Sequence, residues 1–307
     1  MQSSNSILLV KPVKFYFNEE AARDNPYMSS TSLSQQELNE VVTKEFDNLH
    51  KNLVERDIEV TVFDSLESTP ESLFCNNWNS THSTKETTEN TLVLYPVKVQ
   101  NRRLERRVDI IDCIKEKFKI GKVLDLSFHE NEANPLYLES TGSIIFNRLK
   151  KTAYLALSER SSEKLFNYVS EFLGYKPISY HSFDKNGIPI YHTNCVMAIG
   201  TGYTVICLES IPLSERNLLT DQLKKDGLEI IDITLDQVSN FCGNCLEVTN
   251  SKRDKKFLFM SARAKKNLRP SQIDQILKYV NEIVGVDIET IENIGGGSVR
   301  CMLCELY

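Results

Sequence analysis

The sequence ENIGGGSVRCMLCELY, residues 292–307, ends the chain with three consecutive glycines that are soon followed by a cysteine, Cys301. Glycine loses more conformational entropy on folding than any other residue, so three in a row need a reason. One reason is a tight turn before a last strand, which is predicted at residues 299–306. The other is a loop whose backbone approaches a substrate while it presents the Cys301 thiol.

The composition of the chain is that of an ordinary globular protein. It has 307 residues, of which 41% are hydrophobic and 25% are charged. This length suffices for one large domain or for two ordinary ones. The net charge of −6 argues weakly against a nucleic-acid-binding protein, and the short basic clusters at residues 102–107 and 252–256 are interpreted as solvated faces.

The sequence predicts no membrane partner. No stretch approaches the roughly 18 apolar residues that a membrane-spanning helix needs. The first residues, MQSSNSILLVKPV, lack the basic region and the long apolar run of a signal peptide. We therefore expect a cytoplasmic protein whose eight cysteines are reduced thiols rather than a disulfide framework.

Predicted strands and helices alternate along the chain. Short apolar runs bounded by Gly, Pro, Asn and Ser predict strands at residues 7–10, 58–63, 91–97, 143–146, 153–157, 205–208, 256–260 and 299–306. Apolar residues at helical spacing predict helices at residues 35–56, 103–118, 161–173, 214–226 and 270–285. Residues 79–90, NSTHSTKETTEN, are predicted to form a flexible loop.

This alternation indicates a structural repeat of five strand–strand–helix–strand units. Such units can close radially, as the blades of a propeller do, which leaves few exposed sheet edges. A doubly wound sheet is the alternative, but no glycine-rich phosphate loop follows an early strand. We therefore expect an α/β protein with five ββαβ repeats, and residues 1–307 as a single domain.

Two cysteine pairs, Cys242/Cys245 and Cys301/Cys304, have the spacing of zinc ligands. The pairs are separated by residues 246–300, far more than the roughly 15–20 residues usual in four-cysteine sites. The second pair also lies in a predicted strand, where residues three apart point to opposite faces. We therefore expect no metal site here.

Three residues stand out as candidates for thiol chemistry, which needs a thiolate and a positioned proton carrier. Cys301 follows the glycines and Arg300, whose charge would favour a thiolate. His192 stands at a predicted strand start in PIYHTNCVMAIG, and Glu139 precedes a small-residue turn in YLESTGSIIFNR. Taken alone, the histidine is more often structural and the glutamate more often caps a turn.

Several segments together resemble the guanidino-group-modifying, or pentein, superfamily. They are LLVKPVKFYFNEEAARDN (8–25), FCNNWNSTH (74–82), NRRLERRVDIID (101–112), LESTGSIIFNR (138–148), ALSERS (156–161), YHTN (191–194), FCGNCLEV (241–248) and GGGSVRCML (295–303). The superfamily includes arginine deiminases, amidinotransferases and dimethylarginine dimethylaminohydrolases, and the most similar branch is the amidinotransferase-like one that includes citrulline hydrolases. Cys75 stands where this branch usually has proline, and Ser140 where it usually has glycine.

The resemblance implies a five-bladed α/β propeller with a central active site, no metal and no cofactor. It implies Cys301 as nucleophile, His192 as general acid and base, and Glu139 as the carboxylate partner of the histidine. Arg160, in LSERS, matches an arginine that holds the substrate α-carboxylate in dimethylarginine hydrolases. An arginine of NRRLERR is expected to help, Arg102 rather than Arg103.

The substrate is suggested by Asn77 and Asn194, which match two aspartates that hold the guanidinium in arginine deiminases. A carboxylate only accepts hydrogen bonds, whereas an amide both donates and accepts them. A ureido group offers donors, an acceptor and no charge, so two amides favour citrulline over arginine. The expected reaction is hydrolysis of citrulline to ornithine, ammonia and carbon dioxide.

Alternative functions stay open at this point. A guanidino substrate would make the protein an arginine deiminase, a dimethylarginine hydrolase or an amidinotransferase. The superfamily fold also serves as a non-catalytic binding module in the ribosome anti-association factor. The expected partner is a small amino-acid substrate, nucleic acid is not expected, and a homodimer is left open.

Overall fold

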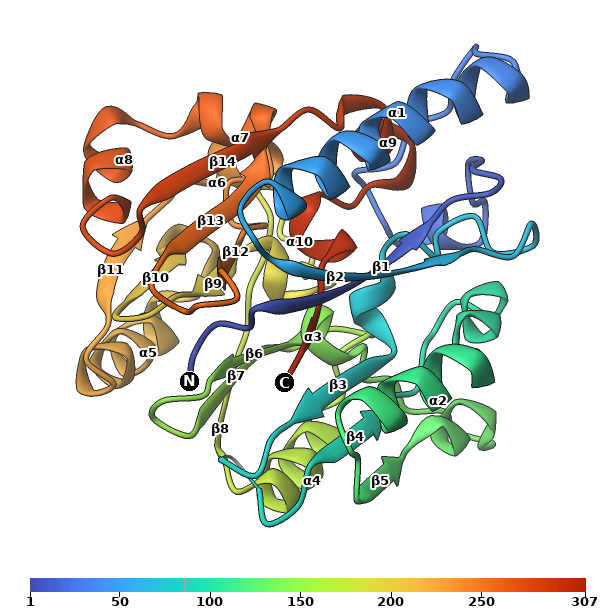
Figure 1. The fold of residues 1–307 in the computed structure, drawn as a ribbon. Coiled ribbons are helices and arrows are strands. Elements are labelled where there is room, and N and C mark those ends of the chain that lie inside the picture. Colours follow the sequence, from blue (N-terminus) through green and yellow to red (C-terminus); the bar gives the residue numbers. More distant parts are fainter. Residues whose placement is uncertain (86) are drawn as a thin grey trace.

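The computed structural model describes residues 1–85 and 87–307, which form five small sheets of three strands each (Figure 1). In every sheet one edge strand pairs antiparallel with the central strand, and the other edge strand pairs parallel with it. A helix precedes each parallel edge strand, because a parallel connection needs a crossover. The predicted α/β class and the ββαβ units are therefore present in the structure.

Four of the units are continuous in sequence. The first contains β3 (Asn79–His82), β4 (Thr91–Leu94), α2 (Val108–Lys117) and β5 (Lys122–Asp125). The second contains β6 (Ile144–Asn147), β7 (Thr152–Ala156), α4 (Glu163–Leu173) and β8 (Lys176–Tyr180). The third contains β9 (Met197–Ile199), β10 (Tyr203–Ile206), α5 (Leu213–Lys225) and β11 (Glu229–Asp232). The fourth contains β12 (Leu246–Thr249), β13 (Lys256–Ser261), α7 (Ala262–Asn267), α8 (Pro270–Ile276) and β14 (Glu282–Val286).

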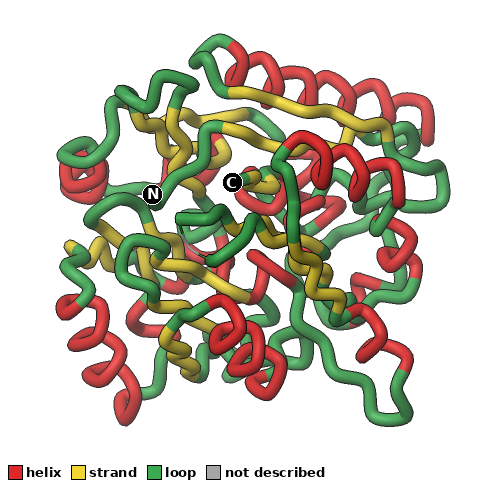
Figure 2. Tube along the Cα trace, turned by 60° about the horizontal axis from the view of Figure 1, so that its bottom comes forward, coloured by secondary structure: helices red, strands yellow, loops and turns green. Residues whose placement is uncertain are grey.

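The fifth unit joins the two ends of the chain. Strand β15 (Cys304–Leu306) pairs with β1 (Ser6–Lys11), which is followed by α1 (Gln35–Val54) and β2 (Glu59–Asp64). The termini therefore lie side by side in Figures 1 and 2, and the Tyr307 hydroxyl donates to the Gln2 carbonyl at 2.7 Å. This pairing brings β15, which directly follows the segment that carries Cys301, onto the first strand of the chain.

Further short elements lie between these units. They are the helices α3 (Ser140–Ser143), α6 (Leu235–Ser239), α9 (Glu289–Gly295) and α10 (Val299–Met302), and the 3₁₀ helices η1 (Ala21–Arg23), η2 (Cys75–Asn77), η3 (Asn101–Glu105), η4 (Ser127–Asn131), η5 (Thr193–Cys195) and η6 (Leu208–Ser210). Turns of this kind directly precede the antiparallel edge strands β3, β6, β9 and β15. They carry several of the predicted site residues.

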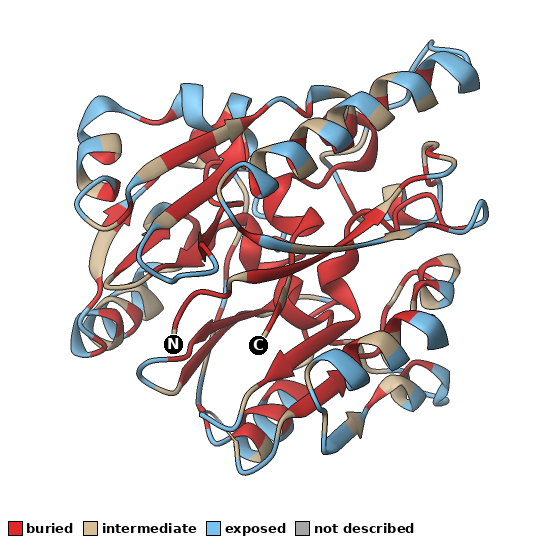
Figure 3. Cartoon of the chain, viewed as in Figure 1, coloured by how far each residue is buried: buried red, intermediate tan, exposed pale blue. Residues whose placement is uncertain are grey.

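The strands are mostly buried and the longer helices lie at the periphery (Figures 2 and 3). Helix α1 shows why: Leu38, Val42, Phe46, Leu49 and Leu53 recur at helical spacing, and all five are buried. The helix starts with a reciprocal capping box between Ser34 and Glu37. Within the described residues, no helix is long and apolar enough to cross a membrane.

Among the sequence-based predictions that differ from the structure, three concern the residues around the site or the last repeat. Residues 79–82, part of the loop predicted at 79–90, form the buried strand β3, because their polar side chains find internal partners. Residue 86 of that predicted loop lies outside the described residues. The helix predicted at 270–285 ends at Ile276, and residues 282–286 form β14 instead. The strand predicted at 299–306 is shorter, because residues 299–302 form helix α10.

Candidate active site

Five of the seven predicted site residues line one cavity of about 290 Å³, namely Cys301, His192, Asn77, Arg160 and Arg102. The other two, Glu139 and Asn194, do not line the cavity and are fully buried. Glu139 contacts His192, and Asn194 contacts Cys301. Distant segments of the sequence therefore meet in one place.

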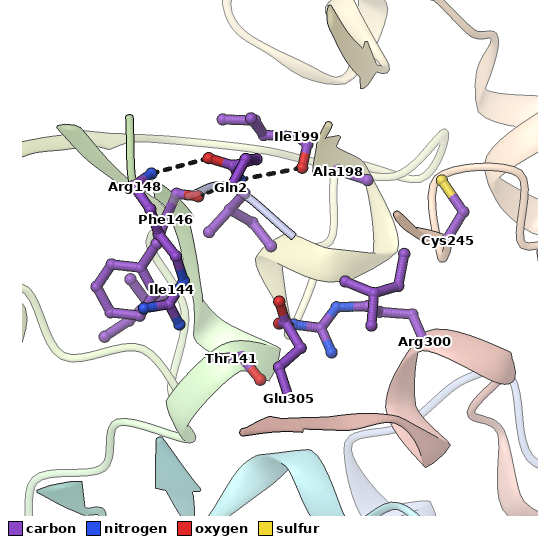
Figure 4. Close-up of a pocket in the computed structure, with 12 residues that line it drawn as sticks. Gln2, Thr141, Ile144, Phe146, Arg148, Ala198, Ile199, Cys245, Arg300 and Glu305 are labelled. Carbon is purple, nitrogen blue, oxygen red and sulfur yellow. Dashed lines mark hydrogen bonds and ion pairs between the residues drawn. The ribbon is translucent and has the colours of Figure 1, made fainter. Parts of the chain in front are cut away.

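A second cavity, drawn in Figure 4, is lined by none of the seven. Arg300, the residue before Cys301, lines this second cavity, where its guanidinium pairs with Glu305 at 2.8 Å and donates to the Leu303 carbonyl at 2.9 Å. Gln2 spans part of the wall through hydrogen bonds to Phe146, Ile199 and Arg148 (Figure 4). The charge of Arg300, which the sequence suggested would favour a thiolate at Cys301, is therefore already paired with Glu305.

The three glycines of the opening motif have two different structural roles. Gly296 ends α9 with a φ of +65°, a left-handed conformation that glycine adopts without strain. A Cβ atom on Gly295 or Gly297 would lie 2.6 or 2.9 Å from the ring of Phe74. Both Gly295 and Gly297 line the Cys301 cavity, so the glycines make a turn and also form a close-packed cavity wall.

The Cys301 sulfur is surrounded by amide donors. Asn244 Nδ2 lies 3.2 Å from Sγ, and Asn194 Nδ2 lies 3.7 Å from it. Asn244 is buried and is fixed by two further bonds, from Arg300 N to its Oδ1 at 3.0 Å and from its Nδ2 to the Asn194 carbonyl at 3.2 Å. Donors in this position stabilise negative charge on sulfur.

Asn244 was not identified from the sequence. One signal could have identified it: an Asn–Cys pair precedes β9 in YHTNCVMA and β12 in FCGNCLEV. Asn194 and Asn244 therefore occupy the same place in two successive repeats. Equivalent positions of two repeats thus contact the same sulfur atom, and the repeated Asn–Cys pair was the signal for the second asparagine.

His192 is oriented by Glu139, whose Oε2 lies 2.7 Å from Nε2 of the imidazole. The other carboxylate oxygen, Oε1, accepts the Lys98 backbone N–H at 2.9 Å. With Nε2 engaged, Nδ1 is the ring nitrogen left to exchange a proton in the cavity. A Cβ on Gly142 would come within 2.9 Å of Nδ1, so the glycine keeps this side of the ring free.

Burial and charge set opposite protonation preferences for the two partners. Burial alone would raise the pKa of Glu139, but Arg160 and the His192 hydrogen bond outweigh it and hold that pKa below its usual value. Burial lowers the pKa of His192, although Glu139 opposes this effect. The resting state is therefore an ionised carboxylate beside a neutral imidazole at neutral pH.

The turn after Glu139 departs from the superfamily pattern at Ser140. This residue has a φ of +41°, in the region that favours glycine. Its hydroxyl donates to the Asn79 carbonyl at 2.6 Å, which helps to hold the serine in this conformation. The turn thus keeps the geometry that glycine would give, and Glu139 keeps its place behind His192.

Both predicted arginine clamps reach the cavity, and both already contact carboxylates. Arg160 binds Asp24 through Nη2 and Nε, and its Nη1 lies 3.5 Å from Oε2 of Glu139. Arg102 donates to Glu105 from Nε and Nη2 at 2.8 and 3.0 Å. Arg103 is directed elsewhere, to the carbonyls of residues 97 and 98, so Arg102 is the better candidate of the two.

Two further polar groups face the cavity. Asn77 is buried, and among the described residues its Oδ1 has no hydrogen-bond partner, so this acceptor is available to a ligand. Glu71, which the sequence did not suggest, lies 3.5 Å from Nε of Arg102 and accepts from Asn18 Nδ2 at 3.2 Å. Burial raises the pKa of Glu71 to about 7, because it outweighs the attraction of Arg102.

The arrangement is that of a cysteine-dependent enzyme of the superfamily suggested by the motifs. The family model of eukaryotic N,N-dimethylarginine dimethylhydrolases matches residues 11–307. The chain belongs to this family. It is thus a hydrolase-type member of the guanidino-group-modifying superfamily, and the resemblance inferred from the sequence is confirmed. Among curated proteins, no sequence is similar to the chain.

Solved structures share its fold. The N-terminal domain of ArgZ, an arginine dihydrolase of cyanobacteria, superposes with a TM-score of 0.72 and 15% identity over 97% of this chain and 96% of that domain. A histidine-to-glycine variant of a dimethylarginine dimethylaminohydrolase, in its adduct with S-methyl-L-thiocitrulline, superposes with a TM-score of 0.65 and 15% identity. The match covers 98% of this chain and 99% of that one. The chain spans only 40% of the ArgZ chain in its apo structure, with a TM-score of 0.74 and 15% identity over 97% of this chain. At these identities the likeness establishes the fold.

Proposed function

We propose that residues 1–307 are a single catalytic domain whose five units close as a five-bladed propeller, and that it hydrolyses the ureido C–N bond of citrulline. The observation that carries the proposal is the joint presence, around one cavity, of Cys301, the His192–Glu139 pair and the amides of Asn77 and Asn194. Cys301 is the nucleophile, and His192 is the general acid and base.

The first half-reaction forms a thioester. The Cys301 thiol passes its proton to neutral His192, and the sulfur attacks the ureido carbon. The bond from that carbon to the δ-nitrogen breaks, and His192 protonates the departing amine to give ornithine. A carbamoyl group stays on Cys301, and the donors of Asn194 and Asn244 stabilise the sulfur when it carries charge.

The second half-reaction frees the enzyme. Water gives a proton to His192 and attacks the carbonyl carbon of the thioester, and the carbon–sulfur bond breaks. The cysteine recovers its proton and carbamate leaves, which decomposes to ammonia and carbon dioxide. Glu139 holds the imidazole in one orientation through both steps, because its carboxylate stays ionised beside Arg160.

The charges around the cavity support a neutral reacting group. Glu139 is already engaged by His192, Arg160 and the Lys98 backbone, so it has little capacity to neutralise a second cation. Asn77 provides an uncharged acceptor instead. Glu71, which also lines the cavity, lies 3.5 Å from Nε of Arg102, and burial raises its pKa to about 7, so it too is poorly suited to pair with a second cation. A buried guanidinium without a carboxylate partner would lose the ion pairing that offsets its desolvation. Arg160 and Arg102 would bind the α-carboxylate of the substrate.

A methylated arginine is the second candidate substrate, and the family match favours it. The test is a comparison of kcat/KM for citrulline, arginine, dimethylarginine and agmatine on one preparation, with Cys301→Ser as the inactive control. Citrulline should be the best substrate, and ornithine its product. A tenfold or greater preference for arginine or dimethylarginine would contradict the ureido assignment and leave the hydrolase class intact. We expect a cytoplasmic enzyme that needs neither metal nor cofactor.

A further inference from the structure

Asp24 contacts the guanidinium of Arg160 in the way that a substrate carboxylate would. It follows η1 (Ala21–Arg23), and its Oδ1 contacts Nη2 of Arg160 while its Oδ2 lies 3.3 Å from Nε. This two-point contact is the geometry in which arginine prefers to hold a carboxylate. Arg160 has only 3% of its side chain exposed, whereas Asp24 has 25%. The contact therefore lies at the outer side of the buried guanidinium.

Arg160 has little room for a second carboxylate while Asp24 is bound. Its Nη1 lies 3.5 Å from Oε2 of Glu139, and the Tyr191 ring lies 5.1 Å from the centre of the guanidinium. Arg102 differs: among the described residues, its Nη1 has no hydrogen-bond partner. A ligand carboxylate can thus reach Arg102 directly, but it can reach Arg160 fully only after Asp24 leaves.

The segment that carries Asp24 borders the cavity. Ala21 and Asn25, on either side of Asp24 in sequence, both line it. Asn25 Nδ2 donates to the Gly296 carbonyl at 3.3 Å, and Ser29 N donates to the Asn293 carbonyl at 2.7 Å. Outside the cavity, Lys98 Nζ lies 2.7 Å from Oδ2 of Asp24 and also contacts the exposed Glu159. Lys98 therefore offers Asp24 an alternative partner when it leaves Arg160.

We propose that Asp24 is a specificity-determining residue that occupies the carboxylate position on Arg160 in the free enzyme. A ligand with an α-carboxylate displaces Asp24 onto Lys98, whereas a ligand without one leaves the Asp24–Arg160 pair in place. The inference rests on the proposed function, because it takes Arg160 as the substrate clamp. Removing the charge of Asp24 should strengthen the binding of carboxylated ligands alone.

The experiment measures binding rather than turnover, in the Cys301→Ser background. The matched ligands are citrulline and N-carbamoylputrescine, which differ only in the α-carboxylate. Asp24→Asn should lower the Kd of citrulline by at least about fivefold, the scale of one charge-assisted contact, and leave that of N-carbamoylputrescine within about twofold. Asp24→Ser provides a second variant, and Glu159→Gln, which removes the other partner of Lys98, is the matched control.

Any one of four results would overturn the proposal. The first three are citrulline binding that is unchanged or weaker in both Asp24 variants, an equal gain in affinity for both ligands, and an equal gain in citrulline affinity in Glu159→Gln. The fourth is that neither Asp24 variant binds any α-amino acid. Arg160 would then have lost Asp24 and still not bind the α-carboxylate of a ligand. This binding test can be told apart from the substrate comparison. If citrulline is not the substrate, arginine and agmatine, which also differ only in the α-carboxylate, replace citrulline and N-carbamoylputrescine as the ligand pair.

Discussion

Oε2 of Glu139 lies 2.7 Å from Nε2 of His192, and both side chains are almost completely buried. The two residues are 53 positions apart in sequence. The carboxylate is ionised because Arg160 also contacts it, and the imidazole is held with Nδ1 left for proton transfer. This pair sets the orientation and the protonation state on which the proposed mechanism depends.

Replacement of Glu139 by glutamine should reduce kcat much more than it changes KM. Glutamine keeps the volume but loses the charge that orients the imidazole and stabilises it when protonated. General acid–base contributions suggest a loss of about 10²–10⁴ in kcat. Steady-state kinetics measure it, and the thermal unfolding midpoint shows whether the fold is kept. A kcat within about twofold of wild type would remove Glu139 from the mechanism.

The pH profile should report a neutral His192 in the free enzyme. The imidazole must be unprotonated to accept the thiol proton, so kcat/KM falls as the pH drops through its pKa. Burial lowers this pKa below the ordinary value of 6.5, so the acidic limb should lie below pH 6.5. Below pH 6.5, His192 is protonated in the unfolded state before it is protonated in the folded state. Its contribution therefore destabilises the folded protein as the pH falls below 6.5. An acidic limb above pH 7 would contradict the assignment.

Asn244 should affect catalysis through its contact with the Cys301 sulfur. Asn244→Ala removes the donor 3.2 Å from Sγ and should reduce kcat by roughly 10- to 100-fold. The rate at which iodoacetamide alkylates Cys301 at a fixed pH should fall too, and a purely structural defect elsewhere would not slow it. Asn186→Ala, at an exposed position, is the matched control. An unchanged alkylation rate would show that Asn244 does not act on the thiol.

Asn77 should determine the preference for a neutral substrate. Asn77→Asp replaces an amide that both donates and accepts by a charged carboxylate that only accepts. The variant therefore loses a donor for the ureido oxygen and attracts a cationic guanidinium. The kcat/KM for citrulline should fall at least about tenfold, and the ratio of citrulline to arginine activity should shift toward arginine. Asn77→Ser tests whether loss of the amide alone has this effect. A citrulline-to-arginine ratio that stays constant in Asn77→Asp would refute the role of this residue in selecting charge.

Glu71 should make the stability of the protein depend on pH. Its folded pKa of about 7 lies above the ordinary value of 4.5, so its stabilising contribution is complete below pH 4.5 and is lost as pH rises through 7. Glu71→Gln removes this titration. From pH 5 to pH 8, wild type should lose about 2–3 kcal/mol of unfolding free energy relative to the variant. Urea unfolding at the two pH values measures it, and parallel curves would contradict the raised pKa.

The sequence predicted those elements whose local pattern agrees with their tertiary environment. Helices α1 and α4 were recognised because their apolar residues recur at helical spacing and face the core. Strand β3 was missed because NSTH is polar, and its burial depends on partners such as Tyr95 and Cys304. Local sequence does not encode such distant hydrogen bonds.

The same distinction applies to the site. Cys301, His192 and Glu139 stand in motifs that can be recognised one at a time. Asp24 and Glu71 acquire their roles only when the chain folds, because Arg160 and Arg102 come to them from other units. The ion pairs of Arg160 with Asp24 and of Arg102 with Glu71 could therefore not be predicted from sequence motifs.

The covalent intermediate on Cys301 tests the central claim most directly. Wild-type enzyme mixed with citrulline in a single turnover and quenched in acid should contain a peptide with Cys301 that has gained one carbamoyl group. Cys301→Ser should show no such adduct, and His192→Ala should accumulate little of it because the leaving amine is not protonated. Complete conversion of citrulline to ornithine without an adduct, or an adduct on another residue, would contradict the account.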